Sequence, residues 1–230
     1  MCTVTYLPLG NNDFILTSNR DENPKRKTIA PTSYIEDGVT LTYPKDVLAG
    51  GTWIGVSEKD RLICLLNGGF ENHIRKESYR ASRGVIVKEL LKVEDVVVAI
   101  QELNLADIEP FTIVLVDWSK ELQAYELVWT GEEKSFKKLA NEPHIWSSST
   151  LYTEEMKVLR REWFAAWLEK NKLYTQERIL KFHQDENKGN VEISPKMKRK
   201  RVETISTTVV QKMNTDVSVS YVDYVEMLQD

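Results

Sequence analysis

Cysteine and histidine are scarce in this sequence, and their scarcity excludes several kinds of site. The 230 residues include two cysteines, Cys2 and Cys64, which are too few for a disulfide framework. None of the three histidines has a cysteine, histidine or carboxylate at the spacing of a metal-ligand set, and no haem-attachment or zinc motif occurs. We therefore expect reduced cysteines, as in the cytoplasm, and neither a metal nor another cofactor.

Long apolar runs and an excess of basic residues are also lacking. No run approaches the length that crosses a bilayer, and the first residues lack the basic start and apolar core of a secretory signal. The net charge of −4 argues against a nucleic-acid partner, because such proteins are normally basic. Neither a phosphate-binding loop nor a Gly-x-Ser-x-Gly elbow is present. We expect a cytoplasmic protein without a membrane span, whose partner is a small molecule; the oligomeric state is not indicated.

The order of the predicted elements is that of an α+β protein. No linker interrupts the chain, so we expect one domain over residues 1–230. The hydrophobic pattern predicts strands, then helices, then strands, then helices and a closing pair of strands. The polar stretch with two prolines at residues 23–32 is predicted to be a surface loop.

Four helices are predicted from capping residues and apolar spacing. Three of them follow a residue whose hydroxyl can cap a helix, and these residues are Ser82, Thr153 and Thr175. The remaining helix is expected within residues 93–103. In the helix after Thr153, several apolar side chains share one face that we expect to be buried: Met156, Leu159, Trp163 and Trp167.

The first hairpin carries the most informative residues. Residues 2–7 and 13–18 are rich in β-branched and aromatic types and are predicted to be strands, with turn-forming residues between them. In a one-to-one antiparallel ladder, residue 2 then lies opposite residue 20 or 21. The hairpin is therefore expected to bring the thiol of Cys2 beside Arg20 and Asp21.

Such a position suits a nucleophile. An initiator methionine is usually removed before a small residue, and its removal would give Cys2 a free α-amine. That amine titrates near about 8 and can act as a local base, while a neighbouring arginine lowers the pKa of a thiol from about 8.5. N-terminal nucleophile hydrolases use this arrangement. The alternative is that Cys2 is a small buried residue and that Arg20 and Asp21 form an ion pair at a strand end.

A second candidate position follows the most apolar strand of the chain. Residues 61–67 form a nearly continuous apolar run, which predicts a strand buried on both faces. The run ends at Asn67, Gly68 and Gly69. These residues can present an amide and a backbone N–H to a cleft, or they can form a turn in which asparagine and glycine adopt positive φ.

Five motifs, taken in order along the chain, resemble those of a known family. They are Met1-Cys2-Thr3, Asn19-Arg20-Asp21-Glu22, Ala49-Gly50-Gly51-Thr52-Trp53-Ile54-Gly55-Val56, Leu66-Asn67-Gly68 and Ser82-Arg83-Gly84. With these motifs the chain resembles the transport-and-Golgi-organisation proteins, also called NRDE proteins, most specifically over residues 1–92. Those proteins resemble the N-terminal nucleophile (Ntn) hydrolases and are similar to choloylglycine hydrolases and penicillin V acylases. The resemblance implies a four-layer αββα sandwich of two antiparallel sheets.

The resemblance also implies roles for individual residues. Cys2 matches the nucleophile, Arg20 and Asp21 match the pair that positions it, and Asn67 matches a contributor to the oxyanion hole. We expect four further residues to bind substrate: Asn19, Trp53, Gly68 and Ser149. Two positions depart from the acylases, because Ser149 stands nearest to a further asparagine and Ile205 stands where many relatives have an arginine. Both departures argue against bile-salt or penicillin substrates.

Two hypotheses for function follow. In the first, the protein is an N-terminal-cysteine amidase that hydrolyses a linear carbon–nitrogen bond of a small molecule. In the second, it is a binding or transfer protein on the same fold, for haem or another amphipathic ligand. Trp53, Phe70 and Trp146 would then line a pocket, although each is also a plausible core residue. The fold alone does not decide between these hypotheses.

Overall fold

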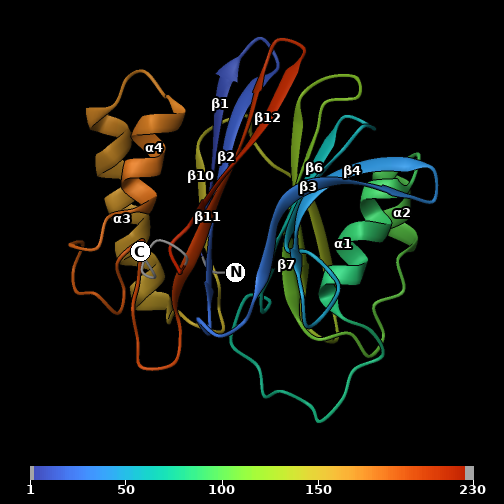
Figure 1. The fold of residues 1–230 in the computed structure, drawn as a ribbon, viewed down its shortest axis with the longest axis horizontal. Helices are drawn as coiled ribbons and strands as arrows, with labels where there is room; N and C mark the ends of the chain where they lie inside the picture. Colours follow the sequence, from blue (N-terminus) through green and yellow to red (C-terminus); the bar gives the residue numbers. More distant parts are fainter. Residues whose placement is uncertain (1–2, 226–230) are drawn as a thin grey trace. The chain divides into compact units, whose positions relative to one another are not determined.

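The computed structural model describes residues 3–225, which form two compact units. The terminal unit combines residues 3–26 with residues 142–225, and the central unit is Lys27–Asn141. Each unit contains one antiparallel sheet with its helices on one face (Figure 1). The predicted α+β class with two antiparallel sheets is confirmed. The expectation of one domain over residues 1–230 stays a prediction.

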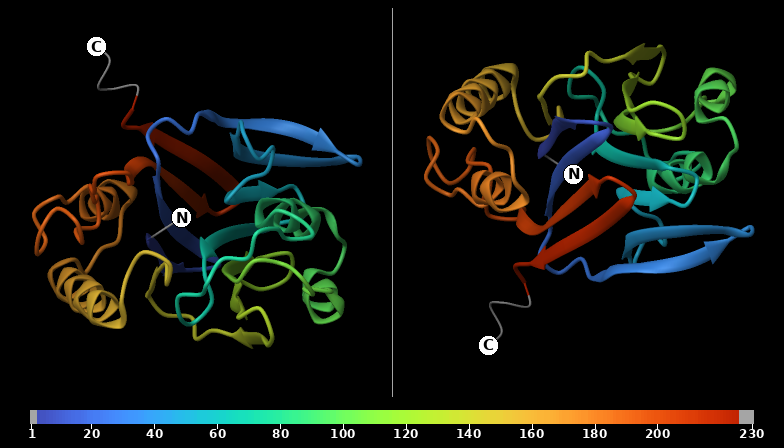
Figure 2. Two further views of the ribbon diagram at one scale, coloured as in Figure 1. Left: turned by 90° about the horizontal axis from the view of Figure 1, so that it is seen from below. Right: turned by 90° about the horizontal axis from the view of Figure 1, so that it is seen from above.

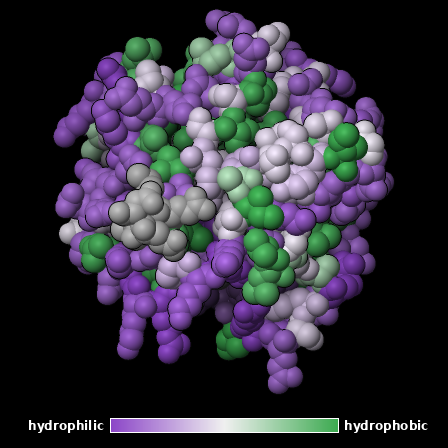
Figure 3. All heavy atoms as spheres, in the orientation of Figure 1, coloured by the Kyte–Doolittle hydropathy of each residue, from purple (hydrophilic) through white to green (hydrophobic). Residues whose placement is uncertain are grey.

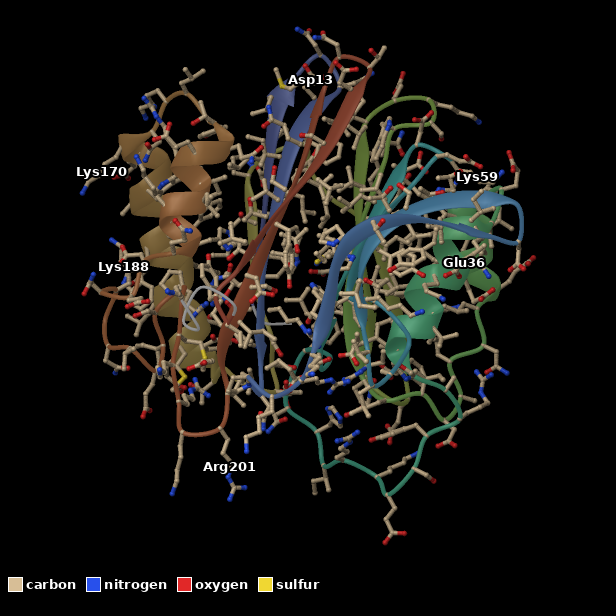
Figure 4. The ribbon with its side chains drawn as sticks, in the orientation of Figure 1. Asp13, Glu36, Lys59, Lys170, Lys188 and Arg201 are labelled. Carbon is tan, nitrogen blue, oxygen red and sulfur yellow. The ribbon has the colours of Figure 1, made fainter. Side chains whose placement is uncertain are left out.

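The sheet of the terminal unit has the strand order β10-β1-β2-β11-β12. Its first two strands form the predicted hairpin, whose turn places Asn11 and Asn12 at positive φ, as a tight hairpin requires. Figure 4 shows Asp13 at this turn, where it accepts a hydrogen bond of 2.7 Å from the backbone N–H of Asn214 in the neighbouring turn. The strands are β1 Thr3–Gly10, β2 Asp13–Glu22, β10 His144–Ser147, β11 Glu203–Met213 and β12 Asp216–Asp223.

Two helices cover one face of this sheet. Helix α3, Glu154–Lys170, and helix α4, Gln176–His183, lie side by side against it in the views of Figures 1 and 2. Phe164 of α3 and Phe182 of α4 pack on the apolar side chains that β1, β2 and β11 turn toward the helices. This packing fixes which residues of each strand face the helices.

The sheet of the central unit runs in the order β3 to β9 without a crossover. Helix α1, Arg83–Lys92, and helix α2, Val96–Glu102, pack on one face of it (Figure 1). Figure 4 shows Glu36 beside α1, where it accepts a hydrogen bond of 2.7 Å from Lys88. The strands are β3 Thr28–Glu36, β4 Val39–Asp46, β5 Ile54–Ser57, β6 Arg61–Asn67, β7 Phe111–Asp117, β8 Gln123–Trp129 and β9 Lys134–Lys138.

The predicted helix starts are confirmed. The hydroxyls of Ser82, Thr153 and Thr175 each accept a hydrogen bond from a backbone N–H of the first turn. The helix expected within residues 93–103 is present as α2 and begins after Asp95, whose side chain caps it. The strand predicted at residues 61–67 is β6, and six of its seven residues are buried.

Two local predictions are wrong. The expected loop at residues 23–32 ends early, because β3 begins at Thr28 and includes Pro31. Proline fits there because β3 is an edge strand and its pairing with β4 shifts register between Ile29 and Thr32. On α3 the prediction is wrong for Leu159, which is 38% exposed, whereas Met156, Trp163 and Trp167 pack against hydrophobic clusters.

The arginine at the start of β6 binds the backbone at the carboxyl end of helix α1. Arg61 is 2% exposed and donates to the backbone carbonyls of Val93 and Glu94 at 2.6 and 2.9 Å. Its Nε also lies 3.6 Å from a carboxylate oxygen of Asp117. These carbonyls belong to the helix end, where backbone acceptors otherwise have no partner.

We expect Arg61→Met to lower the free energy of unfolding by about 2–4 kcal/mol, because it leaves buried backbone carbonyls without their donor and removes the positive charge beside Asp117. Urea unfolding measures this loss. Arg80→Met is the matched control, since Arg80 also donates to two backbone carbonyls but is exposed. Equal losses of unfolding free energy in Arg61→Met and Arg80→Met would contradict the expectation that the buried arginine stabilises the fold more than the exposed one.

The exposed residues are mostly polar. The face drawn in Figure 3 is largely hydrophilic, with hydrophobic residues in small groups between polar ones. Within residues 3–225, none of the helices combines the length and apolarity that crossing a bilayer requires.

Candidate active site

The site is built around the first residues of β1. Cys2, the predicted nucleophile, lies outside the described residues. Thr3 is the first residue of β1, and it pairs with Asn19 of β2 on one side and with Ser147 of β10 on the other. Neighbouring strands therefore flank the start of β1 on both sides.

Residues 19–21 alternate between the two faces of the sheet. Ile15 of β2 packs on the helices, so Asn19 and Asp21, at even spacing from it, face them as well. Arg20 faces away from the helices and pairs with Ser206 of β11. Asn19, Arg20 and Asp21 are each at most 3% exposed. The predicted pair Arg20 and Asp21 thus points to opposite faces of the strand.

Asn19 is bonded within the protein through both ends of its amide. Its Nδ2 donates to the backbone carbonyls of His183 and Pro195 at 2.9 and 2.8 Å. Its Oδ1 accepts from the hydroxyl of Thr207 at 2.8 Å and lies 3.0 Å from Nδ1 of His183. Asn19 therefore joins β2 to the end of α4 and to the loop that follows it.

The bonds around His183 define its tautomer. Because Oδ1 of Asn19 accepts, Nδ1 of His183 carries the proton and donates it. Nε2 then accepts from the hydroxyl of Thr5 at 2.8 Å. Complete burial lowers the pKa of His183 to about 3, and the positive charge of Arg160 contributes in the same direction. His183 is thus a neutral, fully bonded residue behind the first hairpin.

Asp21 is held by two hydroxyl groups. Tyr152 donates to its Oδ2 at 2.9 Å, and Thr204 donates to its Oδ1 at 2.6 Å. The guanidinium carbons of Arg160 and Arg199 lie 4.0 and 5.3 Å from the centroid of the Tyr152 ring, within cation–π distance. Cationic groups from α3 and from the loop before β11 therefore lie against the tyrosine that holds Asp21.

In the central unit, Asn67 and Gly68 end strand β6. Gly68 has a φ of +85°, which agrees with the turn alternative for this segment. Its backbone N–H donates to the carbonyl of Pro110 at 3.0 Å, and its carbonyl accepts from Thr112 at 3.1 Å. The backbone N–H of Gly68 therefore already has a partner within the central unit, and the side chain of Asn67 is half-buried.

Two of the family-like motifs meet in the central unit. A Cβ atom on Gly51 would lie 2.9 Å from the backbone of Gly84, and one on Gly84 would lie 2.8 Å from the backbone of Thr52. Neither position has room for a side chain, which explains why both motifs contain glycine. The close approach joins the segment before β5 to the start of α1.

The remaining predicted residues occupy different environments. Trp53 is buried in the central unit, and its carbonyl accepts from the backbone N–H of Leu65. Ser149 is 6% exposed, and Ile205 lies at a shift of register in β11. Phe70, at 55% exposure, is not packed in a core.

Three residues of the site were not predicted from sequence: Tyr152, Arg160 and His183. Each contacts partners far away along the chain, and His183 is 164 residues from Asn19. The only local signal was that Tyr152 follows a hydroxyl-rich loop. Within residues 3–225, no group of three or more histidine, cysteine, aspartate or glutamate side chains is placed to hold a metal.

Residues 1–226 match the model of the Transport and Golgi organisation 2 (TANGO2) family. The chain belongs to the TANGO2 family. No curated protein sequence matches it.

Solved structures show which fold this TANGO2-family chain adopts. A Caenorhabditis elegans ortholog of N-acylethanolamine-hydrolyzing acid amidase is similar with a TM-score of 0.63 and 12% identity, covering 90% of this chain and 92% of that one. A variant of conjugated bile acid hydrolase from Clostridium perfringens has a TM-score of 0.53 at 11% identity, covering 100% and 93%. Penicillin V acylase from Agrobacterium tumefaciens has a TM-score of 0.50 at 10% identity, covering 98% and 87%. The TANGO2-family chain therefore has an Ntn-hydrolase-like fold.

Proposed function

We propose that this protein is an N-terminal-cysteine amidase that hydrolyses a linear amide bond of a small molecule. The observation that carries the proposal is the pairing of Thr3 with Asn19. This register is that of the hairpin predicted from the sequence, in which residue 2 is expected opposite residue 20 or 21, and Arg20 lies on the face of β2 away from the helices. A cation on that face favours the thiolate form of Cys2.

The similar structures support the same class of reaction. The names of three of them specify an amidase, a hydrolase of conjugated bile acids and an acylase. Their likeness to this chain is one of fold, so the substrate has to be found by experiment. The departures at Ser149 and Ile205 argue for acyl amides other than conjugated bile acids or penicillin V.

The proposed reaction has two steps. After removal of Met1, the α-amine of Cys2 takes the thiol proton, and the sulfur attacks the amide carbonyl to form a carbon–sulfur bond. An N–H donor stabilises the oxyanion, the role that the family resemblance gives to Asn67, and the α-amine gives the proton to the leaving amine as the carbon–nitrogen bond breaks. Water then attacks the thioester, releasing the carboxylic acid and restoring the thiol.

A screen of acyl amides tests the proposal. Intact mass first establishes that Met1 is removed in the sample. We then expect hydrolysis of at least one member of a panel of N-acylethanolamines, N-acyl amino acids, conjugated bile acids and penicillin V, and no hydrolysis by Cys2→Ala. Cys64→Ala is the matched control and should retain activity, because Cys64 is a buried residue of β6.

Two results would contradict the amidase. One is retention of Met1 in the native protein, which blocks the α-amine. The other is hydrolysis that persists unchanged in Cys2→Ala. The alternative of a binding or transfer protein for haem or another amphipathic ligand stays a prediction, and the burial of Trp53 supplies no argument for it.

A further inference from the structure

A buried arginine of helix α3 reaches the start of β1. Arg160 is 1% exposed, and its Nη2 donates to the hydroxyl of Thr3. Its Nε donates to the hydroxyl of Ser147 at 3.1 Å, and its Nη1 donates to the carbonyls of Ile193 and Ser194 at 2.6 and 2.9 Å. One guanidinium therefore joins α3 to β1, β10 and the loop before β11.

The charge of Arg160 is not neutralised by these contacts. Its hydrogen-bond partners among the described residues are hydroxyl and carbonyl groups, and its other contact is the ring of Tyr152 at 4.0 Å. Burying such a cation without a carboxylate is costly, and a hydrophobic residue would fill the space at lower cost. The charge also acts on its surroundings, because it lowers the pKa of His183.

Arg160 is connected to the proposed site by two routes. Through Thr3 it holds the residue that is covalently bonded to Cys2. Through Tyr152, whose hydroxyl donates to Asp21, it holds the end of the Asn19–Asp21 motif. Both routes lead to the same end of the sheet, the end at which β1 begins.

We propose that Arg160 is a positioning residue for the nucleophile. It fixes the side chain of Thr3 and thereby orders the start of β1, the backbone to which Cys2 is bonded. This inference rests on the proposed function, because it assigns a supporting residue to the same site. The residue acts through Thr3 and Tyr152 and does not contact the reacting atoms.

The rate at which iodoacetamide alkylates Cys2 tests the inference without a known substrate. The protein is used with Met1 removed, and mass spectrometry assigns the label to Cys2 or Cys64. At neutral pH we expect alkylation of Cys2 to slow by about tenfold in Arg160→Met, because Thr3 loses the donor that fixes the start of β1. Arg160→Lys, which keeps a donor at this position, should restore part of the rate.

Two further variants separate this role from loss of stability. Arg61→Met removes a different buried arginine, in the central unit, and should destabilise the fold without changing the alkylation rate of Cys2. Thr3→Val removes the hydroxyl that Arg160 binds and should slow alkylation in the same direction as Arg160→Met. In the double variant Arg160→Met and Thr3→Val, the two effects should not add, because the residues act as a pair.

The outcomes distinguish this inference from the proposed function. A wild-type Cys2 that reacts no faster than the buried Cys64 would overturn both. A reactive Cys2 whose rate is unchanged in Arg160→Met would overturn the role of Arg160 alone, as would an equal slowing in Arg61→Met. A rate that falls in both Arg160→Met and Thr3→Val, with partial recovery in Arg160→Lys, supports it.

Discussion

Replacing Arg20 by glutamine is expected to lower kcat/KM of Cys2-dependent amide hydrolysis by at least about 100-fold. The reason is that residue 2 is expected opposite residue 20 or 21 in the first hairpin, so we expect the charge of Arg20 to act on the thiol of Cys2. Glutamine keeps a polar end but removes the charge that favours the thiolate. Arg26→Gln is the control, since Arg26 follows the same strand and pairs with Glu22. Full activity in Arg20→Gln would contradict the assignment.

We expect a different result for Asn19, the residue before Arg20, because it is bonded within the protein. Asn19 makes four hydrogen bonds within the protein, to His183, Pro195 and Thr207. We expect Asn19→Ala to lower the free energy of unfolding by about 3–5 kcal/mol, because several buried groups lose their partners together. Urea unfolding of both variants provides the comparison. A larger loss of stability in Arg20→Gln than in Asn19→Ala would contradict the assignment of Asn19 to stability and of Arg20 to activity.

Mild acid is expected to destabilise the protein through His183. In the fold this histidine is neutral with a pKa of about 3, whereas an exposed histidine titrates near about 6.5. The unfolded chain therefore binds a proton that the folded chain rejects. The contribution of this group is fully present above about pH 6.5 and falls by about 1.4 kcal/mol per pH unit toward pH 3, a loss of about 2–3 kcal/mol at pH 4.5.

Unfolding by urea at pH 7.5, 6.0 and 4.5 measures this loss. The control is His183→Gln, which is expected to be less stable at pH 7.5 but to lose less stability on acidification. Carboxylates with lowered pKa values, such as Glu36 and Glu154, also contribute at acid pH, but they do so in both proteins. Parallel pH dependences in the two proteins would contradict a neutral, buried His183.

Local features of the sequence predicted much of the fold. The hydroxyls of Ser82, Thr153 and Thr175 cap helices because a capping group acts on the two or three residues that follow it. The hairpin turn at Asn11 and Asn12 has the same local origin. The Ntn-hydrolase-like fold was predicted from the family resemblance and not from local patterns.

The supporting residues of the site could not be predicted, because their partners are distant along the chain. Arg160 lies in the charged run Arg160-Arg161-Glu162, which resembles a solvated helix face, yet its side chain is buried. His183 ends a short helix, a position where a histidine is usually exposed. Asn19, which the sequence predicts to bind substrate, has partners in the protein at both ends of its amide, and no local pattern indicates them.

The terminal unit is assembled from two separate stretches of chain, and this affects how it can form during synthesis. Strand β2 pairs with β11, and the hydroxyl of Thr207 donates to Asn19, although the two residues are 188 positions apart in the sequence. The central unit is continuous, so its hydrogen bonds can form while the ribosome is still translating the rest. In the first hairpin, the edge of β2 stays unpaired until β11 emerges, and the candidate site of the terminal unit is therefore among the last parts of the molecule to be completed.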